Sequence, residues 1–91
     1  FYADDSVTFV SIHRFGAGFY PGTGAASETG AGAGLGYTFN AALPRSISRT
    51  DYHTAVENVL HRALAAGKPD LVLISAGFDA HRDDPIGGLG L

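Results

Sequence analysis

The feature that most constrains the fold of this 91-residue chain is a continuous apolar run, Leu71-Val72-Leu73-Ile74, placed directly behind a predicted helix. Uninterrupted apolar strands are typical of parallel sheets that are covered on both faces. A strand, a helix and a second parallel strand together form one right-handed crossover unit. The run therefore predicts an α/β fold containing part of an open, mostly parallel sheet.

The helix is predicted over residues 50–66, with Ser48 or Thr50 as its N-cap. Gly67 is expected to take the left-handed conformation that ends the helix, and Pro69 prevents continuation. The apolar residues of this segment repeat at the three-four spacing of one helical face; they are Tyr52, Ala55, Val56, Val59, Leu60, Ala63 and Leu64.

Two further strands are expected before the helix, in the β-branched and aromatic segments at residues 6–12 and 37–41. Between them, eight of the 13 glycines lie in residues 16–36, too closely spaced for a helix or a strand to persist. This segment is called the glycine-rich loop below. Loops of such length inside a compact domain are uncommon and are usually functional. The whole pattern predicts about three strands and one long helix.

Composition excludes several classes of function. The net charge is −3 and the six Lys and Arg residues are scattered, so direct nucleic-acid binding is not expected. Without Cys, any metal ion must use His, Asp or Glu. No apolar stretch approaches the roughly 18 residues of a membrane span, so we expect a cytoplasmic protein without membrane contact. The low charged fraction, 16%, and the absence of Met suggest a piece of a longer protein.

Asp79 follows the apolar run, in the segment Ser75-Ala76-Gly77-Phe78-Asp79. Ligands of open parallel sheets bind beyond the carboxyl ends of the strands, and the loop after Ile12 falls at the same edge. On position alone, a carboxylate at Asp79 is more often a helix cap or a loop residue than a metal ligand or an acid-base group. Position leaves both readings open.

Two sequence blocks resemble the histone deacetylase and acetylpolyamine amidohydrolase superfamily of zinc-dependent enzymes, especially its class II-like and bacterial members. They occur in the order and approximate separation that the superfamily uses. One block is Ser75-Ala76-Gly77-Phe78-Asp79-Ala80 followed by Asp83-Asp84-Pro85-Ile86-Gly87-Gly88. The other comprises Ser11-Ile12-His13-Arg14-Phe15, residues 18–24, Glu28-Thr29-Gly30, residues 34–37 and Asn40. The resemblance implies an arginase/deacetylase-like fold and hydrolysis of an acetyl amide of lysine or a polyamine.

The resemblance also implies roles for individual residues. Asp79 matches the second of two aspartates that hold Zn²⁺ together with one histidine. Tyr20, its neighbour Phe19, and Ile86 match walls of the acyl channel; without the resemblance, the two aromatics would be expected to pin the glycine-rich loop and Ile86 to pack. The remaining ligands, the catalytic histidine pair and the catalytic tyrosine match nothing here, so no catalytic residue is assigned. The chain is expected to need the rest of the deacetylase domain.

Relatives also bind structural monovalent cations such as K⁺. Ser11 and Ile12 match one such site, through a hydroxyl and a backbone carbonyl. Backbone carbonyls of a second site match Phe1, Asp4, Val7 and Tyr37. Ordinary strand and turn positions are the alternative reading for all six residues.

The four histidines receive no catalytic role. His81 forms an Asp-x-His pair with Asp79 that could mimic two metal ligands, but it is expected to face solvent. His53 and His61 are also expected to face solvent, on the helix. His13 is expected to anchor the glycine-rich loop.

The chain is accordingly divided into residues 1–41 (strand, glycine-rich loop, strand), residues 50–66 (helix) and residues 71–91 (strand and metal-site loop). The competing class is a non-catalytic α/β binding or interaction module, in which Asp79 only caps a loop. A phosphate-binding loop at residues 32–36 is disfavoured because the glycines precede a strand and no helix follows them.

Overall fold

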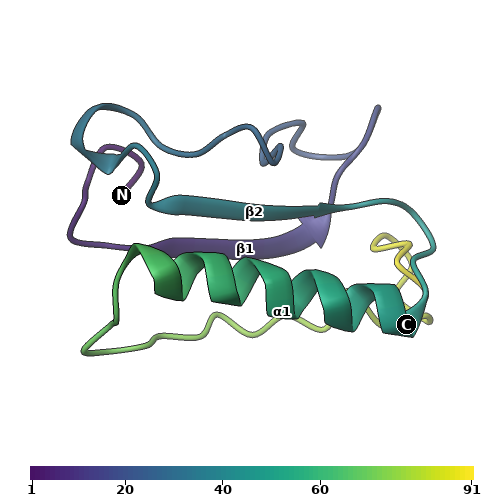
Figure 1. Cartoon of the computed structure of the whole chain (residues 1–91). Coiled ribbons are helices and arrows are strands. Elements are labelled where there is room, and N and C mark those ends of the chain that lie inside the picture. Colours follow the sequence, from purple (N-terminus) through teal and green to yellow (C-terminus); the bar gives the residue numbers. More distant parts are fainter.

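The computed structural model describes all 91 residues. Strand β1 (Phe9–Arg14) and strand β2 (Thr38–Leu43) are separated in sequence by a 3₁₀ turn, η1 (Gly32–Gly34), and are followed by helix α1 (Arg49–Ala66). The strands are parallel, and their register runs from Phe9 opposite Thr38 to Arg14 opposite Leu43. Figure 1 shows α1 along one face of the strands and the glycine-rich loop along the other. The fold is therefore α/β with a parallel sheet, as the sequence predicts.

Helix α1 confirms the strongest local prediction. The Ser48 hydroxyl oxygen accepts a hydrogen bond of 3.0 Å from the Asp51 N–H and caps the helix. The buried side chains of Val59 and Ala63 pack with Phe39 of β2, and this cluster is the core of the chain. Val10, Ile12 and Ala41 pack against it from the strands. Two residues of the predicted apolar face, Leu60 and Leu64, remain 44% and 52% exposed.

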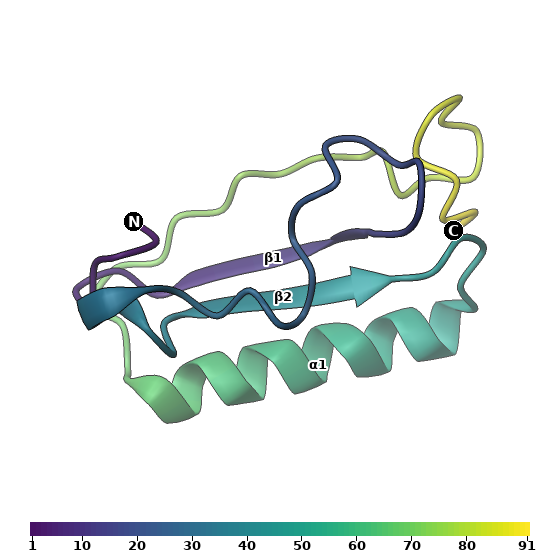
Figure 2. The ribbon, with the colours of Figure 1, turned by 90° about the horizontal axis from the view of Figure 1, so that it is seen from above.

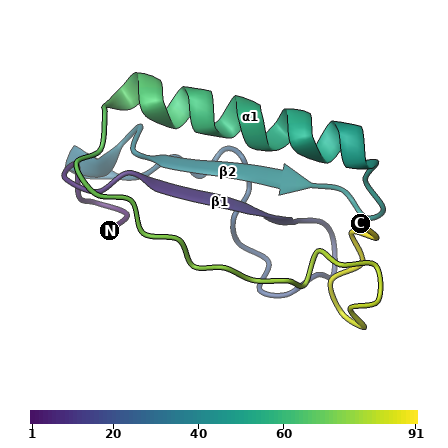
Figure 3. The same ribbon diagram turned by 90° about the horizontal axis from the view of Figure 1, so that it is seen from below.

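The predicted third strand is the main difference between expectation and structure. Residues 71–74 run alongside β1 on the side away from β2 (Figures 2 and 3), but they form no backbone hydrogen bond with it, so the sheet has two strands. Their side chains are 66% to 85% exposed. A doubly covered strand needs layers on both faces, whereas α1 packs on β1 and β2. Nothing in these 91 residues covers the run.

Two local predictions also need correction. The first strand begins at Phe9 rather than Ser6, because Ser6 is drawn into a turn by its hydrogen bonds to the Asp4 carboxylate. Gly67 is extended, with φ 167°, and not left-handed. The chain leaves α1 directly into the extended segment that runs beside β1, so no left-handed turn is needed.

The chain exposes an unusually large surface. Its accessible area is 6577 Å², against roughly 5,000 Å² for a compact monomer of 9.4 kDa. Residues 78–91 fold back on themselves beyond the carboxyl ends of the strands and are called the 78–91 loop below. No helix of the chain combines the length and the apolar character that a membrane crossing requires.

Candidate metal and substrate-channel site

The glycine-rich loop is fastened to the sheet by His13. Its ring Nδ1 lies 2.8 Å from the Ser11 hydroxyl oxygen, and its Nε2 lies 2.8 Å from the Gly24 carbonyl oxygen. A carbonyl can only accept, so Nε2 carries the hydrogen and, in the neutral ring, Nδ1 accepts from Ser11. Gly24 has φ +96°, and a Cβ there would overlap the His13 ring, so glycine is required. The prediction that His13 anchors the loop is confirmed.

Glu28 and Asn40 complete this attachment. The Glu28 carboxylate accepts hydrogen bonds from the backbone N–H groups of Gly24, at 2.6 Å, and Ala25. The buried Asn40 amide donates to the carbonyl oxygens of Ala25, at 3.3 Å, and Glu28, at 3.0 Å. Sequence reasoning gave these two residues no role. The available signal was Asn40 itself, a polar residue within an apolar strand, since buried amides need partners.

Asp79 lies in the 78–91 loop, beyond the carboxyl edge of the sheet. Hydrogen bonds from the Arg82 N–H to the Leu91 carbonyl, at 2.8 Å, and from the Leu91 N–H to the Ala80 carbonyl, at 3.1 Å, close this loop. A Cβ at Gly87 would overlap the carbonyl oxygen of Asp79, so the two backbones are in close contact. The backbone of Asp79 is thereby held at a defined place.

The Asp79 side chain is exposed and takes part in no hydrogen bond or ion pair. Capping in this loop is done instead by Asp84, whose carboxylate accepts from the N–H groups of Ile86, at 3.0 Å, and Gly87. Asp79 therefore does not act as a backbone cap. Its oxygens are free to accept a ligand.

His81 turns toward Asp83 and not toward Asp79. Its ring Nδ1 lies 3.2 Å from the Asp83 backbone nitrogen and 3.8 Å from the Asp83 carboxylate. The side chain of His81 is 62% exposed, and His53 and His61 are also exposed, so the solvent-facing expectation holds for all three. The Asp-x-His spacing does not produce a pair of converging ligands.

A zinc ion would find one ligand in this chain. The free carboxylate of Asp79 suits Zn²⁺, which binds Asp oxygens at about 2.0–2.2 Å. No three His, Asp or Glu side chains gather closely enough to hold a metal ion. Since tetrahedral zinc sites use three or four protein ligands, the residues here fit one position of a zinc site and leave the others to residues outside the chain.

The structure brings two predicted channel residues together through Arg14. The Arg14 guanidinium lies 4.1 Å from the centre of the Phe19 ring, and Nη1 donates to the Ile86 carbonyl, at 3.4 Å, and the Gly87 carbonyl, at 3.2 Å. Tyr20 and Ile86 are 87% and 75% exposed, so neither side chain pins its loop to the core. Phe19 is half-buried beneath Arg14.

The residues matched to the second cation site lie at the opposite, amino end of the strands. The Phe1 carbonyl accepts from the Asp4 N–H and the Tyr37 carbonyl from the Phe9 N–H, each at 2.9 Å; Val7 lies between them in the chain. A carbonyl oxygen has a second lone pair, so these bonds leave room for a cation. Hydrogen bonds from the Ser6 hydroxyl and N–H hold the pKa of Asp4 below its usual 3.8. Ser11 and Ile12 lie apart from this group, within β1.

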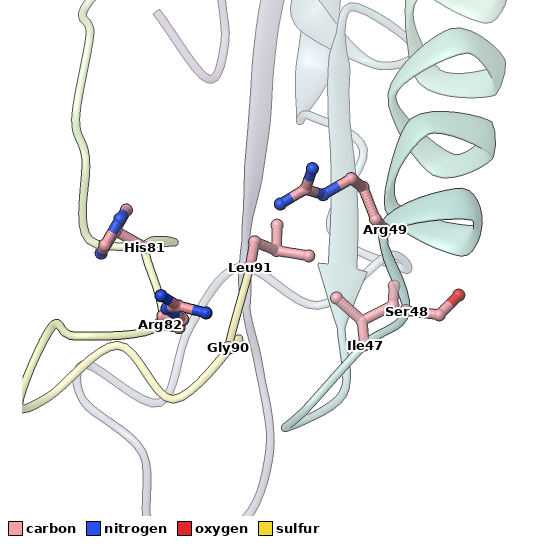
Figure 4. A pocket seen from close by; sticks show the side chains of 7 residues that line it. All are labelled: Ile47, Ser48, Arg49, His81, Arg82, Gly90 and Leu91. Atoms are coloured by element: carbon pink, nitrogen blue, oxygen red, sulfur yellow. The ribbon is translucent and has the colours of Figure 1, made fainter.

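A separate cavity of about 500 Å³ opens beside the start of α1, and none of the predicted site residues lines it. Figure 4 shows Arg49 from the helix and Arg82 from the 78–91 loop on its walls. Sequence reasoning missed it because its walls come from distant segments without a shared motif. The full lining is Ile47, Ser48, Arg49, His81, Arg82, Gly90 and Leu91.

Comparison with known proteins agrees with this fold. Histone deacetylase 15 of Arabidopsis thaliana is 46% identical over 96% of this chain, and acetylpolyamine amidohydrolase of Burkholderia pseudomallei is 43% identical over 93% of it. Among solved structures, acetylpolyamine aminohydrolase from Burkholderia pseudomallei matches with a TM-score of 0.89 at 39% identity, and the HD domain of HDA15 with 0.82 at 46%. Each covers 97% of this chain.

The fold is thus that of the deacetylase class of α/β proteins. The histone deacetylase domain matches residues 1–91, and the chain belongs to this family. The chain spans 16% and 25% of the length of the two curated relatives and 26% of each solved chain.

Proposed function

We propose that this chain is part of a zinc-dependent deacetylase that hydrolyses an acetyl amide of a lysine or a polyamine, and that Asp79 is one of the zinc ligands. The observation that carries the proposal is the free Asp79 carboxylate, whose backbone is fixed against Gly87 beyond the carboxyl edge of a parallel sheet. The names of the relatives, histone deacetylase and acetylpolyamine amidohydrolase, support this reaction class.

Each part of the chain has a task in this reaction. Zinc, when bound, polarises the amide carbonyl and lowers the pKa of a coordinated water. Asp79 supplies a charged oxygen ligand, while Phe19, Tyr20 and Ile86 offer apolar surface that encloses the acyl-bearing arm and excludes water. The general base and the remaining ligands come from residues outside this chain.

The six residues matched to cation sites have a structural task in the proposal. Ser11 and Ile12 would hold one monovalent cation such as K⁺, and the carbonyls of the second group would hold another, at the amino end of the strands. Both would stiffen the sheet that carries the zinc site. The second group is Phe1, Asp4, Val7 and Tyr37.

The rest of the deacetylase domain is the proposed partner of the exposed apolar run at residues 71–74. Covering this run would remove side chains that are 66% to 85% exposed from water and let the segment pair as a strand. We expect the 91-residue chain alone to show no turnover and weak zinc affinity, because a single protein ligand cannot hold the ion against water. A cytoplasmic location, without membrane or nucleic-acid binding, is part of the same proposal.

The test is Asp79→Asn in the complete protein, which keeps the shape of the side chain and removes its charge. We expect zinc content to fall and turnover of an acetyl-lysine reporter to drop by more than the roughly 10–100-fold typical of losing an outer-shell partner of a metal ligand. Metal analysis and steady-state kinetics measure both. The matched control is Asp83→Asn, an exposed carboxylate of the same loop that only contacts His81 and Arg82.

Full zinc occupancy and full activity in Asp79→Asn would remove Asp79 from the ligand set. A complete wild-type protein that binds no zinc and turns over no acetyl amide would instead favour the non-catalytic module. The control should behave as the wild type in both measurements.

A further inference from the structure

We infer that Arg14 is a positioning residue that sets the distance between the two walls of the acyl channel. This inference rests on the proposed function, because it takes Phe19 and Ile86 as channel walls. In this role Arg14 affects substrate binding. It neither ligates zinc nor transfers a proton.

Arg14 uses both the face and the edge of its guanidinium group. The face lies 4.1 Å from the centre of the Phe19 ring, and the edge donates from Nη1 to the carbonyl oxygens of Ile86, at 3.4 Å, and Gly87, at 3.2 Å. A planar guanidinium can stack on a ring with its face while it donates hydrogen bonds in its own plane, whereas a lysine ammonium has no planar face to stack. One side chain therefore contacts both walls.

No backbone hydrogen bond joins the glycine-rich loop to the 78–91 loop. The side-chain hydrogen bonds between the end of β1 and the 78–91 loop are those of Arg14. The Ser46 N–H also donates to the Gly88 carbonyl, at 2.9 Å, and ties the 78–91 loop to the segment before α1. Arg14 is the residue that contacts both Phe19 and Ile86 directly. Because Gly87 also touches the Asp79 carbonyl, the same contact lies next to the proposed zinc ligand.

The surroundings of Arg14 are built to hold it in place. Arg14 is the last residue of β1, and its backbone is paired with that of Leu43 in β2. Leu43 is buried, with 4% of its surface exposed, so this end of the strand pair is held in place. Gly88 leaves space for the guanidinium, since a Cβ there would lie 2.6 Å from Nη1. No carboxylate forms an ion pair with Arg14, so its hydrogen-bonding capacity goes to the loop carbonyls.

The experiment compares Arg14→Ala and Arg14→Lys with wild type in the complete protein, using acetyl-lysine and butyryl-lysine peptides. For Arg14→Ala we expect KM for the acetyl peptide to rise roughly tenfold, as the loss of one charged hydrogen bond implies. Zinc content should stay at the wild-type level. Preference should shift toward the butyryl peptide because the walls can move apart. Arg14→Lys should restore KM only in part.

The matched control is Arg62→Ala. Arg62 also lies over an aromatic ring, 5.6 Å from the centre of Phe39, but on the helix-covered side of the sheet. Its removal takes away an interaction of the same kind without touching either channel wall. KM and acyl preference should remain those of the wild type.

Unchanged KM and unchanged acyl preference in Arg14→Ala would overturn the inference. A fall in kcat and zinc content at constant KM would overturn it as well, because Arg14 would then support only the metal site. If the wild-type protein shows no turnover, the proposed function fails by itself. Amide hydrogen exchange then tests whether Arg14 connects the two loops. Faster exchange in both residues 16–22 and residues 82–88 of Arg14→Ala supports the connection. Faster exchange in only one of the two loops overturns it.

Discussion

The two faces of the β1–β2 pair are held by different kinds of interaction. On the helix side, Phe39, Val59 and Ala63 pack as an apolar cluster. On the loop side, the strands present Asn40 and His13, and the side chains of these two residues fasten the glycine-rich loop by hydrogen bonds. Successive strand residues point to opposite faces, so six residues of β2 serve both purposes.

This difference in interactions predicts how a substitution on each face of the sheet affects the protein. Apolar burial is non-directional and roughly proportional to the area removed from water, so the helix side contributes stability without fixing one geometry. Hydrogen bonds require defined distances and angles, so the loop side fixes the position of the segment that carries Phe19 and Tyr20. Stability and positioning are therefore separated across a single sheet.

The largest expected effect is that of Phe39→Ala, on the helix side. Phe39 is 9% exposed at the centre of the core cluster, so its truncation should lower the free energy of unfolding of the complete protein by about 3–5 kcal/mol. Urea denaturation measures the change. The control is Leu64→Ala, an apolar helix residue that is 52% exposed and should have a much smaller effect. Equal losses for the two variants would remove the special role of this cluster.

A smaller loss is expected for Asn40→Ala, on the loop side. The variant leaves the carbonyl groups of Ala25 and Glu28 without their donor, which should lower the free energy of unfolding by about 1–3 kcal/mol. Unlike Phe39→Ala, it should also raise KM, because the loop that carries Tyr20 is released. Asn58→Ala, an exposed asparagine on α1, is the matched control. If Asn40→Ala loses stability without any change in KM, the loop side of the sheet does not position the substrate channel, and the two faces do not differ in function.

The smallest effect is expected for Leu73→Ser in the 91-residue chain, where this side chain is 85% exposed. The free energy of unfolding, followed by the helical circular dichroism signal in urea, should change by no more than about 0.5 kcal/mol. In the complete protein the same substitution should lower it by about 2 kcal/mol or more, if the rest of the domain covers the run. Equal effects in the two settings would show that nothing further packs on residues 71–74.

The sequence predicted helix α1 and strand β2 well because their signals are local. Ser48 caps the helix, and Val59 and Ala63 face the core at the predicted spacing. The apolar run at residues 71–74 carried an equally clear signal but forms no ladder in these 91 residues. A strand depends on neighbours that its own residues do not encode, whereas a helix satisfies its hydrogen bonds internally.

The sequence proposes which residues form the candidate site but not how they are connected. Asp79 as a metal ligand stays a prediction from its motif, whereas His13 was correctly expected to anchor the loop. The links of Arg14 to Ile86 and Gly87 join residues more than 70 positions apart and leave no periodic pattern in the sequence. The roles of Glu28 and Asn40 depend on which loop carbonyls and N–H groups come within reach, and only the folded chain shows this.

The course of the glycine-rich loop has a consequence for how this region can change. A parallel partner obliges the chain to return from one end of β1 to the other, and six strand residues at about 3.3 Å each span roughly 20 Å. A parallel crossover needs about a dozen residues, yet residues 15–37 are used. About half of the connection is therefore not needed to join the two strands. Insertions or deletions near Ala17 would change the segment that leads to Phe19 and Tyr20 while the sheet register stays intact.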